Sequence, residues 1–529
     1  MPPKMPKVLI ADKMSPLAEE VFKTRGVEAD VITGLAPEDL VAKIGGYDGL
    51  VIRSATKVTP EVLKATERLK VVGRAGIGVD NVDIPAATQR GVVVMNTPSG
   101  NAITTAEHAI ALLFALVRQI PAADRSTQAG KWEKSRFMGV EVTGKTLGIL
   151  GCGNIGSIVA ERALGLKMRV VAYDPFLSPD RAHDLAIEKV ELDDLLGRAD
   201  FITLHLPRTE QTAGIIDAEA LKKTKPGVRI INCARGGLVV EEDLRAAIES
   251  GQVAGAAFDV FAEEPARENP LFGLEQVICT PHLGASTAEA QEKVAVQIAE
   301  QMADYLLTGA VTNALNMPSL SAEDAGRLAP YMTLAEQLGS FAGQLTRSGL
   351  KQVRIEYEGH VAELNCRPLT QAAITGLLRP ILDSVNMVNA PVLARERDIA
   401  VTEVKHDRDS DYQTLIRLTV TTERGPRCVA GTLFGGSKPR IVEVKGISVE
   451  AELGPHMLYI SNEDRPGFIG GLGSILGDAK VNIATFHLGR ATAGADAIAL
   501  IEVDEAITDE VLARIGALPQ IKQVVPLRF

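Results

Sequence analysis

Three residue types that together could oxidise a secondary alcohol follow three strand-like runs in the middle of the chain. Arg235 ends the run "INCAR", Glu264 lies in "FDVFAEEP" and His282 lies in "CTPHLG". A histidine can take the hydroxyl proton near neutral pH, and a carboxylate beside the imidazole orients it and favours its charged form. A guanidinium can grip a substrate carboxylate through two parallel hydrogen bonds. Each residue alone is commonly an ion-pair partner or a structural residue, but three strand ends together favour catalysis.

A glycine-rich loop upstream of these residues predicts that the hydride acceptor is a dinucleotide. Gly151, Gly153 and Gly156 stand in "GILGCGNIGS", after an apolar run and before a helix-like segment. The first glycine permits the tight turn, the second lets a pyrophosphate approach the backbone, and the third lets helix and strand pack closely. The helix N-terminus then offers free N–H groups to the phosphates. Asp174, 18 positions after Gly156, can accept from a ribose 2′-hydroxyl and would repel a 2′-phosphate, which favours NAD over NADP.

Short apolar runs and amphipathic stretches alternate through the first half of the chain and must position these side chains. Runs that read as strands occupy 7–12, 49–54, 69–76 and 91–98 and, after the glycine loop, 199–207, 228–236, 255–261 and 277–284. Such runs separated by helix-length segments indicate parallel strands with crossover helices. Residues 101–120 read as one long apolar helix that crosses between two such units, and another helix is expected from Thr287 to about Leu307. We therefore predict an α/β fold with two Rossmann-like, doubly wound parallel-sheet domains.

The rest of the chain has a different pattern. Residues 318–449 combine a helical start with strand-like runs such as "QVRIEYEG" and "YQTLIRLTVTTE", which indicates a mixed α+β domain. From about 457 to 529 the order reads strand–helix–strand–strand–helix–strand, which is the ferredoxin-like arrangement. This last stretch offers no pair of nucleophile and base, so we expect no chemistry there.

Composition limits the classes of partner. The chain has 529 residues and a formal net charge of −11, which argues against binding to nucleic acid or an anionic membrane. The five cysteines are scattered and form no C-x-x-C pair, as expected for buried thiols in a reducing cytosol and not for disulfides or a metal site. No signal peptide and no membrane-length apolar run is apparent. We expect a cytoplasmic protein with a small-molecule substrate, no metal, and no nucleic-acid or membrane partner.

Four blocks in order resemble the D-isomer-specific 2-hydroxyacid dehydrogenases: "GCGNIG" with Asp174, "NCARGGLVVEEDL", "DVFAEEP" and "TPHLGAST". The resemblance covers about 7–318 and implies catalytic roles for Arg235, Glu264 and His282. It also implies that the nucleotide domain is inserted within the substrate domain. The implied NAD contacts are the three loop glycines together with Asn154, Ile155, Asp174, Cys233, Ala234, Asp259, His282, Gly284 and Ala285.

Cations in the first unit indicate an anionic substrate. Arg53 directly follows a strand-like run, and Arg74 precedes a second glycine-rich turn in "VVGRAGIGVDNVD". A doubly charged phosphate needs one or more guanidiniums, because arginine matches phosphate with two hydrogen bonds. The alternative is that both arginines are surface ion-pair partners. We favour a phosphorylated substrate, whose predicted contacts are Arg53, Ser54, Arg74, Gly76, Asn101 and Arg235.

The C-terminal part resembles the intervening and ACT domains of long-chain members of the same family. This resemblance implies oxidation of 3-phospho-D-glycerate to 3-phosphooxypyruvate, the first step of the phosphorylated route to L-serine, by a homotetramer. It also implies an L-serine effector site at Asn462, Asp464 and Asn482, the first two of which replace a histidine and an asparagine of the best-known bacterial form. The alternative is an ACT domain that only pairs subunits. The implied domains are 1–99 with 288–318 for substrate, 100–287 for NAD, 319–452 intervening and 453–529 ACT.

Two other functions stay open at the level of the sequence. The same fold and chemistry serve hydroxypyruvate, glyoxylate or D-lactate reductases, although the long tail argues against them. Some proteins of this fold are NAD-sensing transcriptional corepressors that bind partner peptides. An intact set of Arg235, Glu264 and His282 does not exclude that role.

Overall fold

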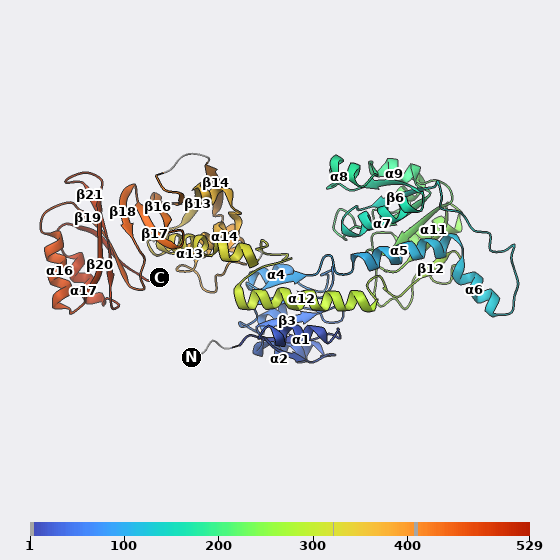
Figure 1. Ribbon diagram of the computed structural model, residues 1–529, viewed down its shortest axis with the longest axis horizontal. Coiled ribbons are helices and arrows are strands. Elements are labelled where there is room, and N and C mark those ends of the chain that lie inside the picture. Colours follow the sequence, from blue (N-terminus) through green and yellow to red (C-terminus); the bar gives the residue numbers. More distant parts are fainter. Residues whose placement is uncertain (1–4, 321, 347, 407–410) are drawn as a thin grey trace.

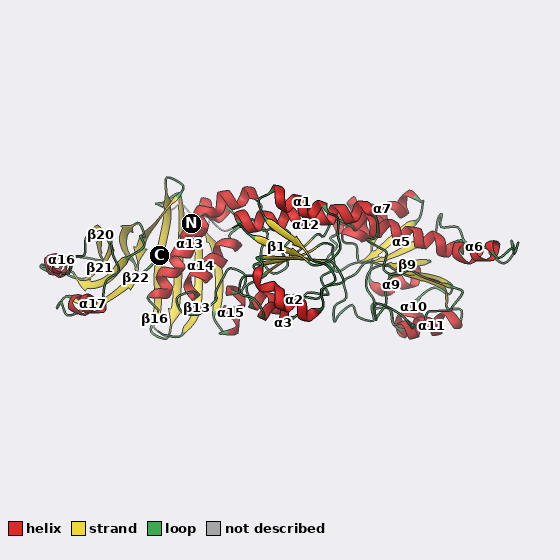
Figure 2. Cartoon of the chain, turned by 90° about the horizontal axis from the view of Figure 1, so that it is seen from below, coloured by secondary structure: helices red, strands yellow, loops and turns green. Residues whose placement is uncertain are grey.

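The computed structural model of the chain describes residues 5–320, 322–346, 348–406 and 411–529. Its units lie in a row (Figure 1): the first α/β lobe is central, the nucleotide lobe lies at one end, and two further sheet units lie towards the other. Figure 2 shows helices on both faces of the two α/β sheets. The predicted order of an α/β pair followed by an α+β unit and a ferredoxin-like unit is confirmed.

The first lobe holds a five-stranded parallel sheet in the order β2-β1-β3-β4-β5. Its strands are β1 (Lys7–Ile10), β2 (Glu28–Val31), β3 (Gly49–Ile52), β4 (Val71–Arg74) and β5 (Val93–Asn96). Its helices are α1 (Leu17–Thr24), α2 (Pro37–Lys43), the short η1 (Ile44–Gly46), α3 (Pro60–Lys64) and α4 (Ile84–Gln89). The strands are short and, apart from the exposed edge strand β2, almost wholly buried, as expected for a parallel sheet that is covered on both faces.

Two long helices cross between the lobes. The first is α5 (Ala102–Val117), and the second is α12 (Ala288–Thr308), which packs beside α1 on the first lobe. Thr287 caps α12, since its Oγ1 accepts from Ala290 N at 3.2 Å. The helix expected at 101–120 is present as α5 but ends at Val117, because Gln119 adopts a left-handed backbone with φ 50° and α6 (Ile120–Gln128) starts anew with a proline in its first turn.

The nucleotide lobe holds a seven-stranded parallel sheet in the order β12-β11-β10-β9-β6-β7-β8. Its strands are β6 (Thr146–Leu150), β7 (Arg169–Tyr173), β8 (Glu188–Lys189), β9 (Phe201–Leu204), β10 (Val228–Asn232), β11 (Val253–Phe258) and β12 (Val277–Cys279). Its helices are α7 (Asn154–Gly165), α8 (Pro179–Asp184), α9 (Leu192–Arg198), α10 (Ala218–Lys223) and α11 (Glu241–Glu249). The strand order reverses between β6 and β9, which opens a crevice at the carboxyl ends of the strands.

The C-terminal half contains two further sheets. After α13 (Ala322–Gln344), a six-stranded sheet has the order β14-β13-β15-β16-β17-β18 and is mostly antiparallel. Its elements are β13 (Leu350–Gly359), η2 (His360–Glu363), α14 (Arg367–Leu378), α15 (Ala390–Glu396), β14 (Ala400–His406), β15 (Thr414–Thr422), β16 (Gly425–Phe434), β17 (Lys438–Val444) and β18 (Ile447–Ala451). The last unit holds a four-stranded sheet in the order β20-β21-β19-β22. Its elements are β19 (Met457–Glu463), α16 (Phe468–Asp478), β20 (Ile483–Arg490), β21 (Asp496–Val503), α17 (Asp509–Gly516) and β22 (Ile521–Leu527).

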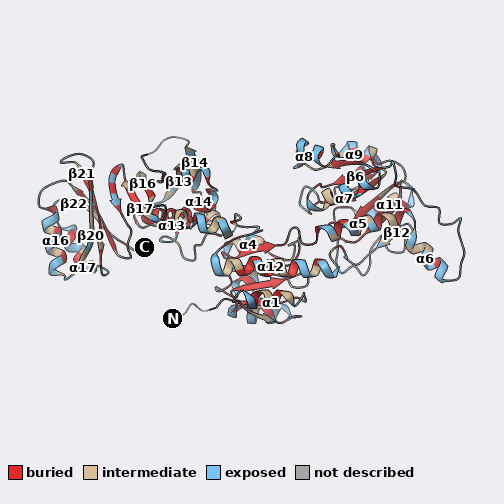
Figure 3. Cartoon of the chain, viewed as in Figure 1, coloured by how far each residue is buried: buried red, intermediate tan, exposed pale blue. Residues whose placement is uncertain are grey.

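The boundaries of the apolar clusters do not follow the boundaries of the sheets. One contiguous cluster runs from the first lobe through α12 and α13 into both C-terminal sheets and includes Val8, Met302, Phe341 and Tyr459. The nucleotide lobe has two clusters of its own, and neighbouring residues of its strands alternate between them. Figure 3 shows the buried strands between helices whose outer faces are exposed. Within the described part of the chain no unbroken helix has both the length and the apolarity to cross a membrane, and only the sharply bent pair α5 and α6 passes that test together.

Candidate active site

Loops that follow neighbouring parallel strands bring the three predicted catalytic residues to one crevice. Arg235 follows β10, Glu264 follows β11 and His282 follows β12. Two adjoining cavities of about 530 and 860 Å³ occupy this crevice. Residues of both lobes line both cavities, among them Ser54, Arg74, Asn101, Glu264 and His282. The predicted catalytic and substrate residues therefore face a common space, at the edge of the sheet where such folds bind ligands.

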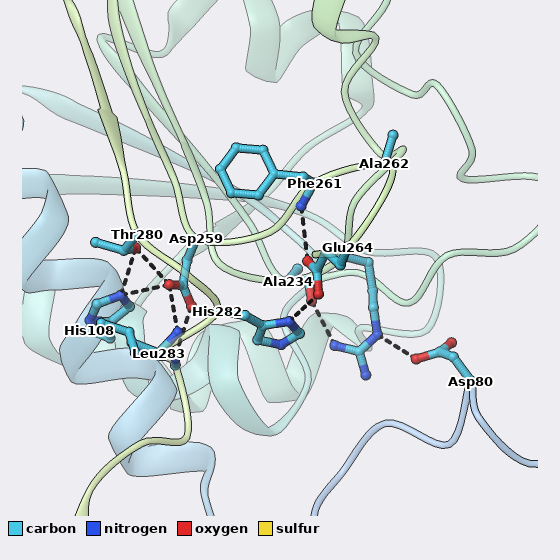
Figure 4. A network of polar contacts seen from close by, with 12 residues as sticks. Asp80, His108, Ala234, Asp259, Phe261, Ala262, Glu264, Thr280, His282 and Leu283 are labelled. Atoms are coloured by element: carbon cyan, nitrogen blue, oxygen red, sulfur yellow. Dashed lines mark hydrogen bonds and ion pairs between the residues drawn. The ribbon is translucent and has the colours of Figure 1, made fainter. Parts of the chain in front are cut away.

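His282 and Glu264 form a directly paired imidazole and carboxylate. Nδ1 of His282 lies 2.7 Å from Oε2 of Glu264, and Oε1 of Glu264 accepts from Phe261 N at 3.0 Å (Figure 4). The hydrogen bond to Glu264 raises the pKa of His282 above its usual value, although burial opposes this. Burial raises the pKa of Glu264, but its hydrogen bonds to His282 and to the Phe261 amide outweigh burial and leave it lowered. With Nδ1 engaged, Nε2 is the ring nitrogen left for a ligand.

Arg235 is held from both lobes. Its Nη1 donates to Ala234 O at 2.6 Å, and its Nε donates to Oδ2 of Asp80 in the first lobe at 3.0 Å. The turn beneath it is fixed by the fully buried Asn232, whose Oδ1 accepts from Ala234 N and whose Nδ2 donates to Arg235 O. Two of the three guanidinium nitrogens are thus occupied, and Nη2, which has no partner among the described residues, can meet an anion.

Arg74 is a partly buried cation that forms no ion pair with a carboxylate among the described residues, although the charges of Asp80 and Asp12 act on it. Its guanidinium makes one long contact, from Nη1 to Ala75 O at 3.4 Å, and its Nε is buried with no partner among the described residues. Burial, together with the charges of Arg235 and Arg53, lowers the pKa of Arg74 to about 10. A side chain at Gly76, where φ is 143°, would overlap Nη1 of Arg74. A buried guanidinium without a counter-ion is costly, and a bound anion would relieve that cost.

Other predicted substrate residues surround this cation. Arg53 N donates to Oδ2 of Asp12 at 2.6 Å, while its side chain reaches the solvent side and the wall of the larger cavity. Ser54 and Asn101 line both cavities, and the buried Oδ1 of Asn101 has no partner in the part of the chain that is described. Gly76 lines the larger cavity. The structure brings all six predicted substrate residues to the walls of these two cavities.

The glycine loop has the form that a dinucleotide needs. Gly151 has φ 91°, and a side chain at Gly156 would overlap the Gly151 carbonyl. A side chain at Gly153 would meet nothing within 4 Å, so the outer face of the loop is open, and no side chain caps the N-terminus of α7. Asp174 is tied to the loop, because its Oδ2 accepts from Cys152 N at 2.8 Å. The loop, the free helix N-terminus and the carboxylate fit NAD.

The remaining predicted NAD residues divide into two groups. Asn154, Ile155, Cys233, Ala234, His282, Gly284 and Ala285 line the smaller cavity. Asp259 lines neither cavity: its side chain is completely buried behind the turn that carries His282. The carboxylate of Asp259 accepts from the backbone of Leu283 and Gly284, so its contact with that turn is direct.

The three predicted effector residues lie in the last sheet unit and each has a separate partner. Nδ2 of the buried Asn462 donates to Glu463 O. Oδ2 of Asp464 accepts from Arg490 Nη1 at 3.0 Å and from Gly494 N at 3.1 Å. Nδ2 of Asn482 donates to Asp504 at 2.8 Å. The structure joins none of the three to another by a hydrogen bond.

Known proteins resemble this chain over almost its whole length. The D-isomer specific 2-hydroxyacid dehydrogenase NAD binding domain profile matches residues 110–284, the D-3-phosphoglycerate dehydrogenase intervening domain matches 327–445, and the ACT domain matches 456–520. D-3-phosphoglycerate dehydrogenase of Synechocystis is 44% identical over 99% of this chain and 95% of that protein. The chain belongs to the D-isomer-specific 2-hydroxyacid dehydrogenase family. The corresponding enzyme of Archaeoglobus fulgidus is 42% identical over 97% of this chain and 98% of its own.

Solved structures of the family match the two α/β lobes. A glyoxylate reductase from Paecilomyes thermophila is 30% identical, with a TM-score of 0.55 over 59% of this chain and 98% of that one. D-2-hydroxyisocaproate dehydrogenase is 26% identical, with a TM-score of 0.53 over 58% of this chain and 99% of that one. As a member of this family, the protein is an NAD-dependent oxidoreductase.

The 2-hydroxyacid dehydrogenase site also contains residues that the sequence did not single out. Asp80 and Asn232 stand inside motifs that were recognised, yet nothing in the spacing shows that both serve Arg235. Glu241 is buried on α11 and accepts from Ala262 N and Asn269 Nδ2, which fixes the loop that leads to Glu264. His108 on α5 reaches Asp259 at 3.2 Å. Its place in an apolar helix gave no signal of that contact.

Proposed function

We propose that the protein oxidises 3-phospho-D-glycerate to 3-phosphooxypyruvate with NAD, the first step of the phosphorylated route to L-serine. Arg74 carries this proposal: a partly buried guanidinium that forms no ion pair among the described residues lines the same two cavities as the His282–Glu264 pair. Relatives named D-3-phosphoglycerate dehydrogenase that cover nearly the full chain support the substrate.

The substrate is bound through its two anionic ends. We infer that Arg53 and Arg74 take the phosphate and that Nη2 of Arg235 takes the carboxylate. Arginine suits both, because its planar donors match phosphate and carboxylate oxygens in pairs. Ser54, Gly76 and Asn101 complete the walls around the substrate. The hydroxyl carbon then lies between the two ends and within reach of His282.

His282 is the base. Its Nε2 takes the hydroxyl proton while the carboxylate of Glu264, at 2.7 Å from Nδ1, stabilises the imidazolium that forms. When bound, NAD accepts the hydride from the hydroxyl carbon. The loop glycines, Asp174 and the residues of the smaller cavity would hold it. Arg235 keeps the substrate carboxylate in place and stabilises negative charge near the reacting oxygen.

The division of labour follows the lobes. We infer that 1–99 with 288–318 bind the substrate, that 100–287 bind NAD, and that 319–452 and 453–529 are the intervening and regulatory ACT domains. The return of the chain to the first lobe after α12 supports this division. There Ala314 bridges to Met95 and Asn316 Oδ1 accepts from Val94 N at 2.9 Å.

We infer that the enzyme acts in the cytoplasm as a homotetramer and that L-serine is its effector. Support for assembly comes from large apolar side chains around α6 and the loop after it. Trp132 is 77% exposed, Met138 80% and Ile120 52%. Exposed apolar side chains that gather in one place mark a surface for contact with another subunit. Asn462, Asp464 and Asn482 are the proposed serine contacts. Five free cysteines are in keeping with a reducing compartment.

One assay tests the substrate and the effector together. The purified chain is mixed with NAD at alkaline pH and with 3-phosphoglycerate or unphosphorylated D-glycerate, and nicotinamide absorbance is followed with and without L-serine. We expect reduction of NAD that strongly favours the phosphorylated substrate and falls when serine is added. Equal rates with D-glycerate would instead favour a hydroxypyruvate, glyoxylate or D-lactate reductase. Unchanged rates with serine would leave the ACT domain as a pairing module.

A further inference from the structure

The carboxylate of Asp259 accepts three hydrogen bonds from the turn that carries His282. Its Oδ1 accepts from Thr280 Oγ1 at 2.6 Å and from Leu283 N at 2.7 Å, and its Oδ2 accepts from Gly284 N at 2.8 Å. In the sequence these three donors flank His282 on both sides, and Figure 4 shows Thr280 and Leu283 directed at Asp259. One buried carboxylate thus closes the turn around the base.

The turn needs to be held, because its central residue has an unfavourable backbone. His282 has φ 55°, in the left-handed region that residues with a side chain rarely adopt. Such a conformation persists only where surrounding contacts impose it. Since the ring direction of His282 depends on this backbone, the bonds to Asp259 also set where Nε2 points.

His108, on α5, is a side chain outside the turn that contacts Asp259. Its Nε2 lies 3.2 Å from Oδ1 of Asp259 and 3.4 Å from Thr280 Oγ1. Since the hydroxyl of Thr280 donates to Asp259 and a carboxylate only accepts, Nε2 of His108 carries the proton at both contacts. No Lys or Arg forms an ion pair with Asp259 in the described ranges, and His108 is the side chain from another element that contacts its carboxylate. Burial raises the pKa of Asp259, but the bonds from His108, Thr280 and the turn outweigh burial and lower it.

The same face of α5 grips the turn at a second point. One turn before His108, Oγ1 of Thr105 donates to Gly284 O at 2.8 Å. Since α5 begins at Ala102, directly after the connection between the lobes, the crossing helix is tied to the base-bearing turn at both Gly284 and Asp259.

We propose that His108 is a positioning residue for the reaction: by its contacts with Thr280 Oγ1 and the carboxylate of Asp259, it fixes the turn that aims His282 at the substrate. The inference rests on the proposed role of His282 as the base. His108 lines neither cavity, so it acts through Asp259 and does not touch the substrate.

Two variants separate this role from mere support of the fold. His108→Ala removes the donor, while His108→Gln restores an N–H donor as many bonds from Cβ as Nε2. We expect kcat for phosphoglycerate oxidation to fall roughly tenfold or more in His108→Ala, the effect of one hydrogen bond to a charged group, with KM for phosphoglycerate unchanged. A larger isotope effect with substrate deuterated at the hydroxyl carbon should accompany it, because hydride transfer then limits turnover. His108→Gln should recover most of kcat.

Glu107→Gln is the matched control, since Glu107 is the exposed neighbour of His108 on α5 and lines neither cavity. A wild-type kcat in His108→Ala would overturn the proposal, and so would a His108→Gln variant as slow as His108→Ala.

Hydrogen exchange of the folded, full-length protein gives a readout that needs no turnover. The Leu283 and Gly284 amides should exchange at least about tenfold faster in His108→Ala than in the wild type, and near the wild-type rate in His108→Gln. Unchanged exchange in His108→Ala would overturn the proposal. If the wild type fails to oxidise phosphoglycerate, the proposed substrate falls, while the exchange comparison still decides whether His108 holds the turn.

Discussion

Nε of Arg235 in the nucleotide lobe donates to Oδ2 of Asp80 in the first lobe across 3.0 Å. The bond joins the two lobes directly beside the cavities, and it orients the guanidinium that we assign to the substrate carboxylate. A movement that brings the two lobes together therefore also orients the guanidinium of Arg235.

Asp80→Asn tests how much that link contributes. Asp80 is 72% exposed, and exposed ion pairs contribute about 0–1 kcal/mol, so we expect KM for phosphoglycerate to rise by no more than about fivefold. Steady-state kinetics measure this, with the exposed Asp39→Asn on α2 as the control. A loss of two orders of magnitude would show that Asp80 itself contacts the substrate.

Glu264→Gln should move the pH profile. The hydrogen bond from Glu264 raises the pKa of His282, so its loss lowers that pKa. In the oxidation direction His282 must be neutral to accept the proton, so the acid limb of kcat/KM should shift to lower pH. We expect the plateau to fall by roughly a hundredfold, because the imidazolium loses its carboxylate. The adjacent Glu263→Gln, which lines neither cavity, should keep the wild-type profile.

Arg74→Ala should discriminate between phosphorylated and unphosphorylated substrates. Losing one charged hydrogen-bonding partner costs about 1.5–3 kcal/mol, so kcat/KM for phosphoglycerate should fall roughly ten- to a hundredfold. The weak rate with D-glycerate should hardly change. Arg267→Ala, at an exposed arginine near Glu264, is the control for loss of a positive charge. Equal losses with both substrates would place Arg74 away from the phosphate.

Asp174→Asn should relax the choice of cofactor. The variant keeps an oxygen that can accept from Cys152 N but removes the charge that repels a 2′-phosphate. We expect the preference for NAD over NADP to fall at least about tenfold, or roughly 1.4 kcal/mol, as measured by kcat/KM with each cofactor. Asp180→Asn, on the nearby α8, should leave the preference intact. An unchanged ratio would mean that other groups exclude NADP.

Local patterns in the sequence were enough to predict the strand ends, because a short buried parallel strand stops where its ligand-binding loop begins. Arg235 and His282 follow β10 and β12 as expected, and the glycine loop opens α7. The end of α5 at Val117 was not predictable to the residue: Arg118 and Gln119 interrupt the apolar run only briefly before Ile120, while the backbone turns at a single left-handed residue.

The partners of these residues could not be predicted, because they come from distant elements. Asp80 meets Arg235 across 155 positions, and His108 meets Thr280 across 172. Spacing along the chain carries no information about such contacts. That Arg74 forms no ion pair with the described residues is likewise a property of the folded cavity and not of its neighbours in the sequence.

One apolar cluster joins the first lobe to both C-terminal sheets, so these three units form the rigid part of the enzyme. A calorimetric scan should resolve the nucleotide lobe, with its separate clusters, as its own transition, while the other three units melt together. A signal received at the ACT end would then reach the crevice by tilting a stiff body about α5 and α12, and the nucleotide lobe would be the part that swings.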